Sequence, residues 1–213
     1  MKKIAIIGAG GFGREVYSLI GHINDISPTY EVLGFYDDGF PLGIDSKGNK
    51  ILGRVVDIKN NTEIEALVIA IGNGPIRKEI YNKLPDYDYP TLIHPSVIIR
   101  EEDKIHMEKG CIICAGVKMT CHIALGQHVL VNLNTTIGHD TKIGSFTSIM
   151  PGANIAGEVV LGSQVLVGMG ANILNKRTIR DNTTIGAGAV VTKNPDAGSV
   201  VVGIPGRELG IRN

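Results

Sequence analysis

The chain has no tryptophan, few aromatic residues and no excess of charge of either sign. Aromatic residues make up 5% of its 213 residues, and 21 lysines and arginines balance 21 aspartates and glutamates. A neutral chain without a basic stripe gives no indication of binding nucleic acid or another polyanion. Glycine is abundant instead, at 28 residues, and abundant glycine with few large rings is typical of a fold with many tight corners.

The chain also lacks a paired set of cysteines and any long apolar run. Its three cysteines, an odd number, argue against a disulfide framework. No window approaches the roughly 18 apolar residues of a membrane span. The apolar run after Lys2 and Lys3 stops at Gly8, which is too short for the core of a typical signal peptide. We therefore expect a cytoplasmic protein that folds around a core and has no membrane association.

An apolar residue recurs every six positions through the second half of the chain. Fourteen consecutive positions with this spacing, from Ile113 to Val191, all hold Ile, Leu, Val or Met. The residue four positions later is small or β-branched until Arg177 breaks that second pattern. A period of six fits neither a helix nor a simple strand, but a short strand followed by a corner accounts for it. Three hexapeptides make one coil, so the pattern predicts a parallel β-helix of about four and a half coils.

The same period begins earlier in a different register. Ile93, Ile99 and Ile105 are spaced by six, and the phase then shifts before Met107. The shift predicts a small insertion or bulge near 100–110 in a coil that starts at about Ile93. A solenoid of this kind can also be an ice-binding protein or a scaffold without catalytic activity.

The first 86 residues carry a different pattern, which predicts a separate α/β domain before a coil domain at 87–213. A buried strand at Lys3–Ile7 is followed by G-x-G-x-x-G at Gly8–Gly13 and by a helical pattern at Arg14–Ile20. In this context the glycines permit a tight turn, and the helix N-terminus offers free N–H groups to a phosphate. Two more strands and a helix are expected at Tyr30–Tyr36, Ala66–Ile71 and Ile76–Leu84.

Only one half of a dinucleotide-binding fold fits before the coil. A complete dinucleotide site uses two such halves, so a mononucleotide or a nucleotide-sugar is expected, and an NAD-dependent oxidoreductase is disfavoured. Asp37 and Asp38 follow the second strand and can bind a ribose hydroxyl or a base edge. With Gly39 they can equally form a polar turn, and the pattern does not decide between the two roles.

The order of a half-Rossmann domain followed by a hexapeptide coil resembles one family, and matching segments span nearly the whole chain. These segments are IIGAGGFGREV, FYDDG, AIGNGPIRKEIY, LIHPSV, IGHDTKIGSF, NIAGEVVLG, IGAGAVVTK and VVGIPGREL. They are similar to the bacterial sugar O- and N-acyltransferases, which include UDP-4-amino-sugar N-acetyltransferases and sialic acid O-acetyltransferases. The resemblance implies a left-handed β-helix and a homotrimer with active sites between subunits. It also implies acetyl-CoA-dependent acetylation of a nucleotide-linked amino-sugar in bacterial surface-glycan biosynthesis.

The resemblance further implies roles for individual residues. The nucleotide would be held by the glycine turn, the acidic pair and the glycine after the third strand: Gly10, Gly11, Phe12, Asp37, Asp38 and Gly72. Acetyl-CoA would lie in the groove between neighbouring subunits, where Met169 and Ala187 align with contacts of the family. The segment Gly203–Arg207 resembles the closing segment near the pantetheine.

His139 and Asp140 are the candidate catalytic residues. The imidazole stands at the third position of its hexapeptide and can project outward at a corner. Acyl transfer from a thioester needs a base to deprotonate the amine or hydroxyl that attacks, and histidine titrates near neutral pH. An adjacent carboxylate fixes the tautomer and favours the imidazolium. An isolated His-Asp pair is usually a surface turn, but the resemblance implies that His139 is the general base and that Asp140 orients it.

One position departs from the family pattern. The best-known N-acetyltransferases of the family carry a second histidine near the thioester, where this chain has Ser148. A hydroxyl can donate a hydrogen bond but carries no charge at neutral pH. The acceptor therefore stays open between an amino-sugar and the hydroxyl of a sugar such as sialic acid. A nucleotide-binding scaffold without catalysis is the alternative from another class.

The cysteines have the residue types of a zinc site but not its arrangement. Cys111-x-x-Cys114 is followed by Cys121-His122. These cysteines fall at different hexapeptide positions and need not converge, so no metal is expected. The other histidines of the coil have no evident partner and are expected at the surface: His106, His122 and His128.

Overall fold

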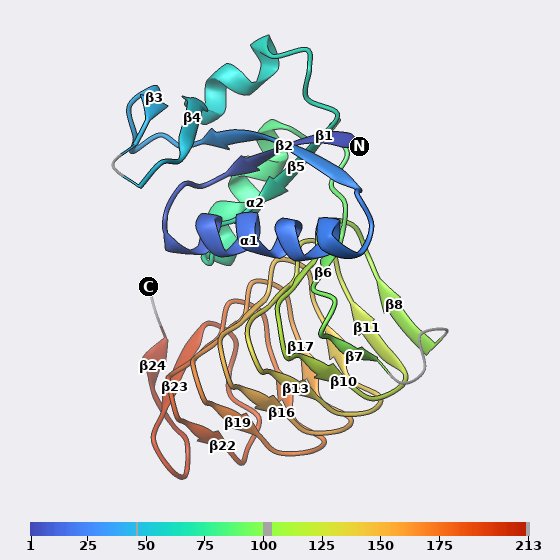
Figure 1. Ribbon diagram of the computed structural model, residues 1–213. Helices are drawn as coiled ribbons and strands as arrows, with labels where there is room; N and C mark the ends of the chain where they lie inside the picture. Colours follow the sequence, from blue (N-terminus) through green and yellow to red (C-terminus); the bar gives the residue numbers. More distant parts are fainter. Residues whose placement is uncertain (46, 100–103, 212–213) are drawn as a thin grey trace.

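The computed structural model describes residues 1–45, 47–99 and 104–211. An α/β domain lies on one face of a long coil, and α1 lies between the sheet of that domain and the coil (Figure 1). The predicted fold, a half-Rossmann domain followed by a left-handed parallel β-helix, is confirmed. Among the described residues no helix is long and apolar enough to cross a membrane.

A five-stranded sheet in the order β3-β4-β2-β1-β5 forms the centre of the N-terminal domain. The strands β1 (Lys2–Ile7), β2 (Tyr30–Tyr36) and β5 (Ala66–Ile69) are parallel, with β1 in the middle. Beyond β2 lie β4 (Lys50–Gly53), also parallel, and β3 (Gly43–Ile44), which is antiparallel at the edge. The sequence predicted the first three strands and missed the last two, which are short, with two and four residues.

Among the described residues, α1 (Gly11–Ile26) connects β1 to β2, and the 3₁₀-helix η1 (Val55–Asn60) lies between β4 and β5. The helix α2 (Gly74–Lys83) follows β5 and leads to the coil. The third glycine of the predicted turn allows α1 to approach β1, because a Cβ on Gly13 would lie 1.9 Å from the Gly8 carbonyl oxygen.

The coil has three faces. The domain face, which meets the N-terminal domain, is formed by β6 (Leu92–Ile93), β9 (Ile112–Ile113), β12 (Leu130–Val131), β15 (Ser148–Ile149), β18 (Leu166–Val167), β21 (Thr184–Ile185), β23 (Ser199–Val202) and β24 (Arg207–Ile211). The asparagine face is formed by β7 (Ile98–Ile99), β10 (Lys118–Met119), β13 (Thr136–Ile137), β16 (Asn154–Ile155), β19 (Asn172–Ile173) and β22 (Val190–Val191). The third face is formed by β8 (Ile105–Met107), β11 (Ile123–Leu125), β14 (Lys142–Ile143), β17 (Val160–Leu161) and β20 (Thr178–Ile179).

The strand register confirms both the coil length and the early phase shift. Thr136 pairs with Asn154, 18 residues along the chain. In the first coil Ile99 pairs with Met119, whereas Met107 pairs with Leu125. The number of residues between partners therefore changes between β7 and β8, within the predicted interval of 100–110. Residues 100–103 of that interval lie outside the described residues.

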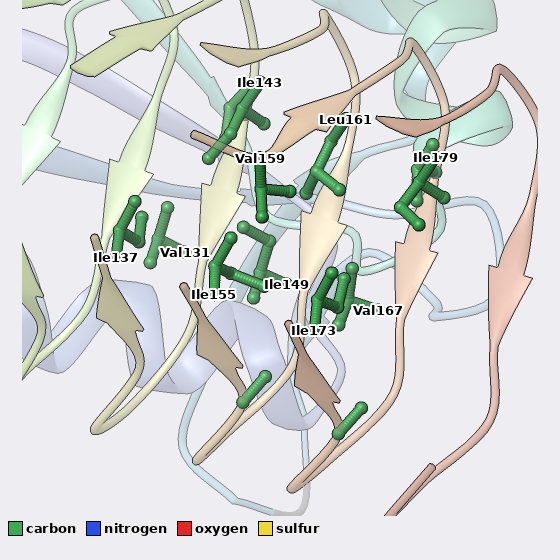
Figure 2. Close-up of a cluster of buried hydrophobic side chains, with 14 of the residues drawn as sticks. Val131, Ile137, Ile143, Ile149, Ile155, Val159, Leu161, Val167, Ile173 and Ile179 are labelled. Carbon is green, nitrogen blue, oxygen red and sulfur yellow. The ribbon is translucent and has the colours of Figure 1, made fainter. Parts of the chain in front are cut away.

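The aliphatic residues of the six-residue period fill the interior of the coil (Figure 2). All fourteen, from Ile113 to Val191, are at most 3% exposed. Small and β-branched residues of the second pattern are buried with them, and the Thr147 hydroxyl donates to the Gly162 carbonyl of the next coil at 2.7 Å. Every sixth residue from Gly110 to Gly188 turns a corner with positive φ, and the non-glycine ones have φ between 53° and 61°.

The N-terminal domain packs directly against the domain face of the coil and shares an apolar core with it. Val16 and Ile20 of α1 belong to one buried apolar cluster with Leu92, Ile112 and Leu130 of the coil. The predicted boundary between residues 86 and 87 falls in the segment that connects the end of α2 to the start of β6.

Candidate active site

His139 and Asp140 form a hydrogen-bonded pair on an outer corner of the coil. The corner lies between β13 and β14, and Asp140 occupies its left-handed position with φ of 59°. The Asp140 amide donates to the Cys121 carbonyl of the preceding coil. His139 Nδ1 lies 2.8 Å from Asp140 Oδ2, and both side chains are about half exposed. The predicted geometry, a pair that projects outward from a corner, is confirmed.

The next coil leaves room for the imidazole at Gly157. A Cβ at that position would lie 2.5 Å from His139 Nε2, so a larger residue would displace the ring. The Glu158 amide donates to the His139 carbonyl at 2.7 Å and holds the two corners together. Because a carboxylate at Nδ1 favours the Nδ1–H tautomer, the lone pair of Nε2 is left to accept a proton.

A cavity of about 800 Å³ opens at the carboxyl edge of the N-terminal sheet. Its apolar lining includes Tyr36, Ile71 and Ile80, and η1 and α2 contribute residues to its two sides. The carboxyl edge is where open parallel α/β sheets bind their ligands. The charged residues that line the cavity are Asp37, Asp38, Arg54, Lys59, Glu79 and Lys83.

Of the two roles that the sequence left open for the acidic pair, the polar turn is observed, and the binding of a ribose hydroxyl or base edge stays a prediction. Asp37 and Asp38 line the cavity, and each also holds backbone amides. Asp37 Oδ2 accepts from the Ala9 amide at 2.7 Å, and Oδ1 accepts from the Gly39 amide at 2.8 Å. Asp38 Oδ1 accepts from the Val55 amide at 2.9 Å. Asp37 therefore ties the glycine turn to the end of β2, at the mouth of the cavity.

The glycine turn lies beside this cavity, at the start of α1. Gly10 and Gly11 are exposed, and a Cβ on either would have no neighbour within 4 Å. α1 begins at Gly11 without a side-chain cap, so the amides of its first turn are open to an anion. Phe12 packs against the interdomain apolar cluster. In the described part of the chain the cavity itself is lined by Gly8 rather than by Gly10, Gly11 or Phe12.

Gly72 and Ser148, predicted to contact two different ligands, contact each other. The Ser148 hydroxyl donates to the Gly72 carbonyl at 2.7 Å and accepts from Arg77 Nη1 at 2.9 Å. Ser148 is 1% exposed, so within one chain its hydroxyl is enclosed between the domains. A contact between Ser148 and acetyl-CoA stays a prediction. Arg77, which is buried beside Ser148, was not predicted from the sequence, because its environment exists only after the domains dock.

Met169 and Ala187 lie on a different edge of the coil from His139. Both are exposed at corners that join the domain face to the asparagine face. Met169 is 62% exposed, and its carbonyl accepts from the Gly188 amide. His139 stands at the opposite edge of the asparagine face, where that face meets the third face. One chain therefore does not bring the predicted catalytic pair and the predicted acetyl-CoA contacts together.

The remaining histidines and cysteines divide between surface and core. His106 and His122 are exposed as predicted, but the prediction for His128 was wrong. His128 is 2% exposed and stacks on Phe146, with ring centroids 5.2 Å apart. The N-terminal domain covers His128, for example through Tyr81 of α2, and the six-residue period cannot reveal this contact. No group of three metal-binding side chains occurs among the described residues, and burial raises the thiol pKa to about 11 in Cys111 and about 12 in Cys114.

A hydrogen-bonded His–Asp pair lies on an outer edge of the β-helix, and a cavity of about 800 Å³ opens in the Rossmann-like domain. Together these two features define the class of protein. The chain has the architecture of a two-domain hexapeptide-repeat acyltransferase. Comparison with known proteins gives the particular relatives. Residues 3–84 match the family model described as the PglD N-terminal domain. The predicted resemblance to the bacterial sugar acyltransferases is therefore confirmed.

Similarity to characterised proteins extends into the coil. The chain is 29% identical over 163 residues to GDP-perosamine N-acetyltransferase of Escherichia coli O157:H7, covering 75% of this chain and 72% of that protein. It is 30% identical over 122 residues to UDP-N-acetylbacillosamine N-acetyltransferase of Bacillus subtilis strain 168, covering 54% of this chain and 52% of that protein. The acetyltransferase domain of PglB from Neisseria gonorrhoeae FA1090, solved in complex with acetyl coenzyme A, superposes with a TM-score of 0.89. That match is 29% identical and covers 98% of this chain and 99% of the domain.

Proposed function

We propose that the protein is an acetyl-CoA-dependent acetyltransferase that acts on a nucleotide-linked amino-sugar, in the manner of UDP-4-amino-sugar N-acetylation. The observation that carries the proposal is the His139–Asp140 pair, held outward over Gly157, with no hydrogen bond to Nε2 in the described part of the chain. Its relatives are named as nucleotide-sugar N-acetyltransferases, and a similar domain was solved with acetyl coenzyme A. We infer a role in bacterial surface-glycan biosynthesis and a cytoplasmic location.

His139 acts as the general base in this reaction. Its Nε2 takes a proton from the sugar amine as the amine nitrogen forms a bond to the acetyl carbon. The carbon–sulfur bond then breaks, and the proton passes to the thiolate of coenzyme A. Asp140 holds Nδ1–H and stabilises the imidazolium that forms between these events. A thioester needs little help with its leaving group, so the chain's main task is to supply this base and align the amine.

The nucleotide occupies the cavity at the carboxyl edge of the N-terminal sheet. The apolar walls accept a base, and Asp37 and Asp38 lie where a ribose or base edge would be bound. The open first turn of α1, at Gly10, Gly11 and Phe12, receives the diphosphate. The sugar then extends from this domain toward the coil.

A homotrimer with active sites between subunits is part of the proposal. Within one chain His139 and the exposed pair Met169 and Ala187 lie on opposite edges of the asparagine face. A neighbouring coil that packs along one edge brings its other edge into the same groove, which unites a base from one subunit with acetyl-CoA contacts from the next. A closed ring of such heterologous contacts is the arrangement that this geometry favours.

The proposal is tested by a substrate screen with two kinds of acceptor. The purified protein is incubated with acetyl-CoA and a panel of UDP-, GDP- and dTDP-linked 4-amino-sugars, and acetylated product is detected by mass spectrometry. Acetylation of an amino-sugar and not of its 4-hydroxy counterpart is the expected result. Transfer to hydroxyl groups, including those of sialic acid, would replace N-acetylation by O-acetylation. Nucleotide binding without transfer to any acceptor would favour a scaffold instead.

A further inference from the structure

A buried arginine joins the two domains. Arg77 lies on α2 and is 1% exposed. Burial lowers the pKa of its guanidinium to about 10, so the group remains charged at neutral pH. No carboxylate pairs with it among the described residues. A buried cation is tolerated only where hydrogen bonds replace its lost hydration.

Carbonyl and hydroxyl oxygens from both domains replace that hydration. Arg77 Nη1 donates to the Ile71 carbonyl at 2.7 Å on the N-terminal side and to Ser148 Oγ on the coil. Nε and Nη2 donate to carbonyls at two corners that are stacked in adjacent turns of the β-helix, at distances of 3.0 to 3.2 Å. These carbonyls belong to His128, Phe146 and Thr147.

Arg77, Ser148 and Gly74 together hold the loop that follows β5 against the coil, and we call these three residues the clamp. The Ser148 hydroxyl links Arg77 to the Gly72 carbonyl. Gly74 presses against the coil so closely that a Cβ on it would lie 2.1 Å from the Phe146 carbonyl oxygen. The loop from Ile71 to Gly74 is therefore fixed to the coil by two hydrogen-bonding side chains and one close backbone contact.

This clamp connects the nucleotide cavity to the coil turn that carries the base. Ile71 before the loop and Ile76 and Ile80 of α2 line the cavity. Ser148 stands on β15, which follows the His139 corner after the single strand β14. A displacement of about 1 Å between acceptor and base can cost about 100-fold in rate. The relative position of these two parts consequently matters to the reaction.

We propose that Arg77 and Ser148 are positioning residues that set the nucleotide cavity at a fixed place relative to His139. The proposal rests on the proposed function, because it concerns alignment of the sugar amine with that base. Both side chains are enclosed between the domains of one chain, each 1% exposed, and Ser148 Oγ is engaged by Arg77 and the Gly72 carbonyl. Their loss therefore reduces turnover while the cavity, formed within the N-terminal domain, keeps its affinity for the nucleotide.

Ser148→Ala is the sharpest variant, because it removes one hydroxyl and leaves the other guanidinium contacts in place. We expect kcat to fall about tenfold, with the Kd for UDP or GDP, measured by calorimetry, within about twofold of wild type. Arg77→Lys, which keeps a charge but loses the planar fork, should behave in the same way. Thr184→Ala is the matched control, since Thr184 occupies the same outward strand position two coils along the domain face. It should leave kcat unchanged.

An unchanged kcat in Ser148→Ala would overturn the proposal. Equal losses in kcat and in nucleotide affinity would also overturn it, because they would indicate that the N-terminal domain itself is destabilised. Hydrogen exchange separates this outcome from failure of the proposed function. If the wild-type protein transfers no acetyl group, the clamp still predicts at least about tenfold faster amide exchange at residues 72–74, 76 and 77 in Ser148→Ala. Wild-type exchange rates at those amides would contradict the clamp whatever the activity.

Discussion

At the scale of single residues, His128 and His139 have opposite environments, although both stand at corners of the β-helix. His139 is half exposed beside Asp140, whereas His128 is enclosed by Tyr81, Tyr89 and Phe146. Burial, and then repulsion by Arg77 and Lys109, lower the pKa of His128 to about 4. Its Nε2 has no hydrogen-bond partner among the residues that the structure describes. His128 therefore folds as a neutral ring that packs like an aromatic side chain.

The buried His128 predicts that the protein loses stability in acid. Its folded pKa of about 4 lies below the ordinary value of 6.5, so the unfolded chain binds the proton first. The contribution of His128 to the free energy of unfolding is fully present above pH 6.5 and is lost as the pH drops toward 4. The loss is up to about 3 kcal/mol for this group. The lowered pKa of His94 acts in the same direction. Urea unfolding between pH 7 and pH 4 measures the loss.

His128→Phe provides the control for this acid sensitivity. Phe146 already occupies a left-handed corner with φ of 60°, so an aromatic residue is tolerated at such a site. The variant should stack as the imidazole does and should flatten the dependence of the unfolding free energy on pH. A variant with the wild-type pH dependence would show that other groups cause the acid sensitivity.

At the scale of elements, the coil could be predicted from the sequence in detail, and the N-terminal domain only in outline. The coil repeats one steric requirement at every turn, an aliphatic residue inside and a tight corner three residues later, so a local pattern specifies it. β1, β2 and α2 were also predicted, since each carries its own apolar pattern. β3 and β4 were not, because their pairing at the sheet edge depends on β2 rather than on their own short sequences.

The left-handed corner at Gly152 predicts that glycine gives a higher free energy of unfolding there than alanine does. Gly152 has φ of 67°, and a Cβ on it would touch nothing within 4 Å. Gly152→Ala should therefore destabilise the protein by about 1 kcal/mol through backbone strain alone. Gly152→Asn should cost less, because asparagine adopts the left-handed region readily, as Asn134 and Asn182 do here. Equal stability of the alanine variant and the wild type in chemical unfolding would be inconsistent with this strain.

At the scale of the whole molecule, the site is distributed over parts that the sequence presents separately. The His139–Asp140 pair could be predicted as a candidate, because the six-residue period places it at a corner and the family resemblance implies its role. Arg77 and the enclosed Ser148 could not, because their partners come from the docking of the domains. The position of His139 and Met169 on two edges of the β-helix has a further consequence for the proposed homotrimer.

The proposed sharing of active sites between subunits predicts complementation. His139→Ala removes the base, and Met169→Trp should block the groove for acetyl-CoA, so each variant alone should be inactive. Co-expressed with different affinity tags, mixed trimers contain some sites built from one intact His139 edge and one intact Met169 edge. An equal mixture should recover about a quarter of the wild-type activity. Mixed assemblies without activity would place the whole site within one subunit.

Thiol release from acetyl-CoA by the His139→Ala variant tests the central claim most directly. With a nucleotide-linked amino-sugar that the wild type acetylates, loss of the base should lower kcat by about 100- to 10,000-fold. The melting temperature should stay unchanged, because the imidazole is exposed and contacts chiefly Asp140. His106→Ala, at an exposed histidine on the third face, is the control and should retain full activity. Full activity in His139→Ala would contradict the assignment of the base.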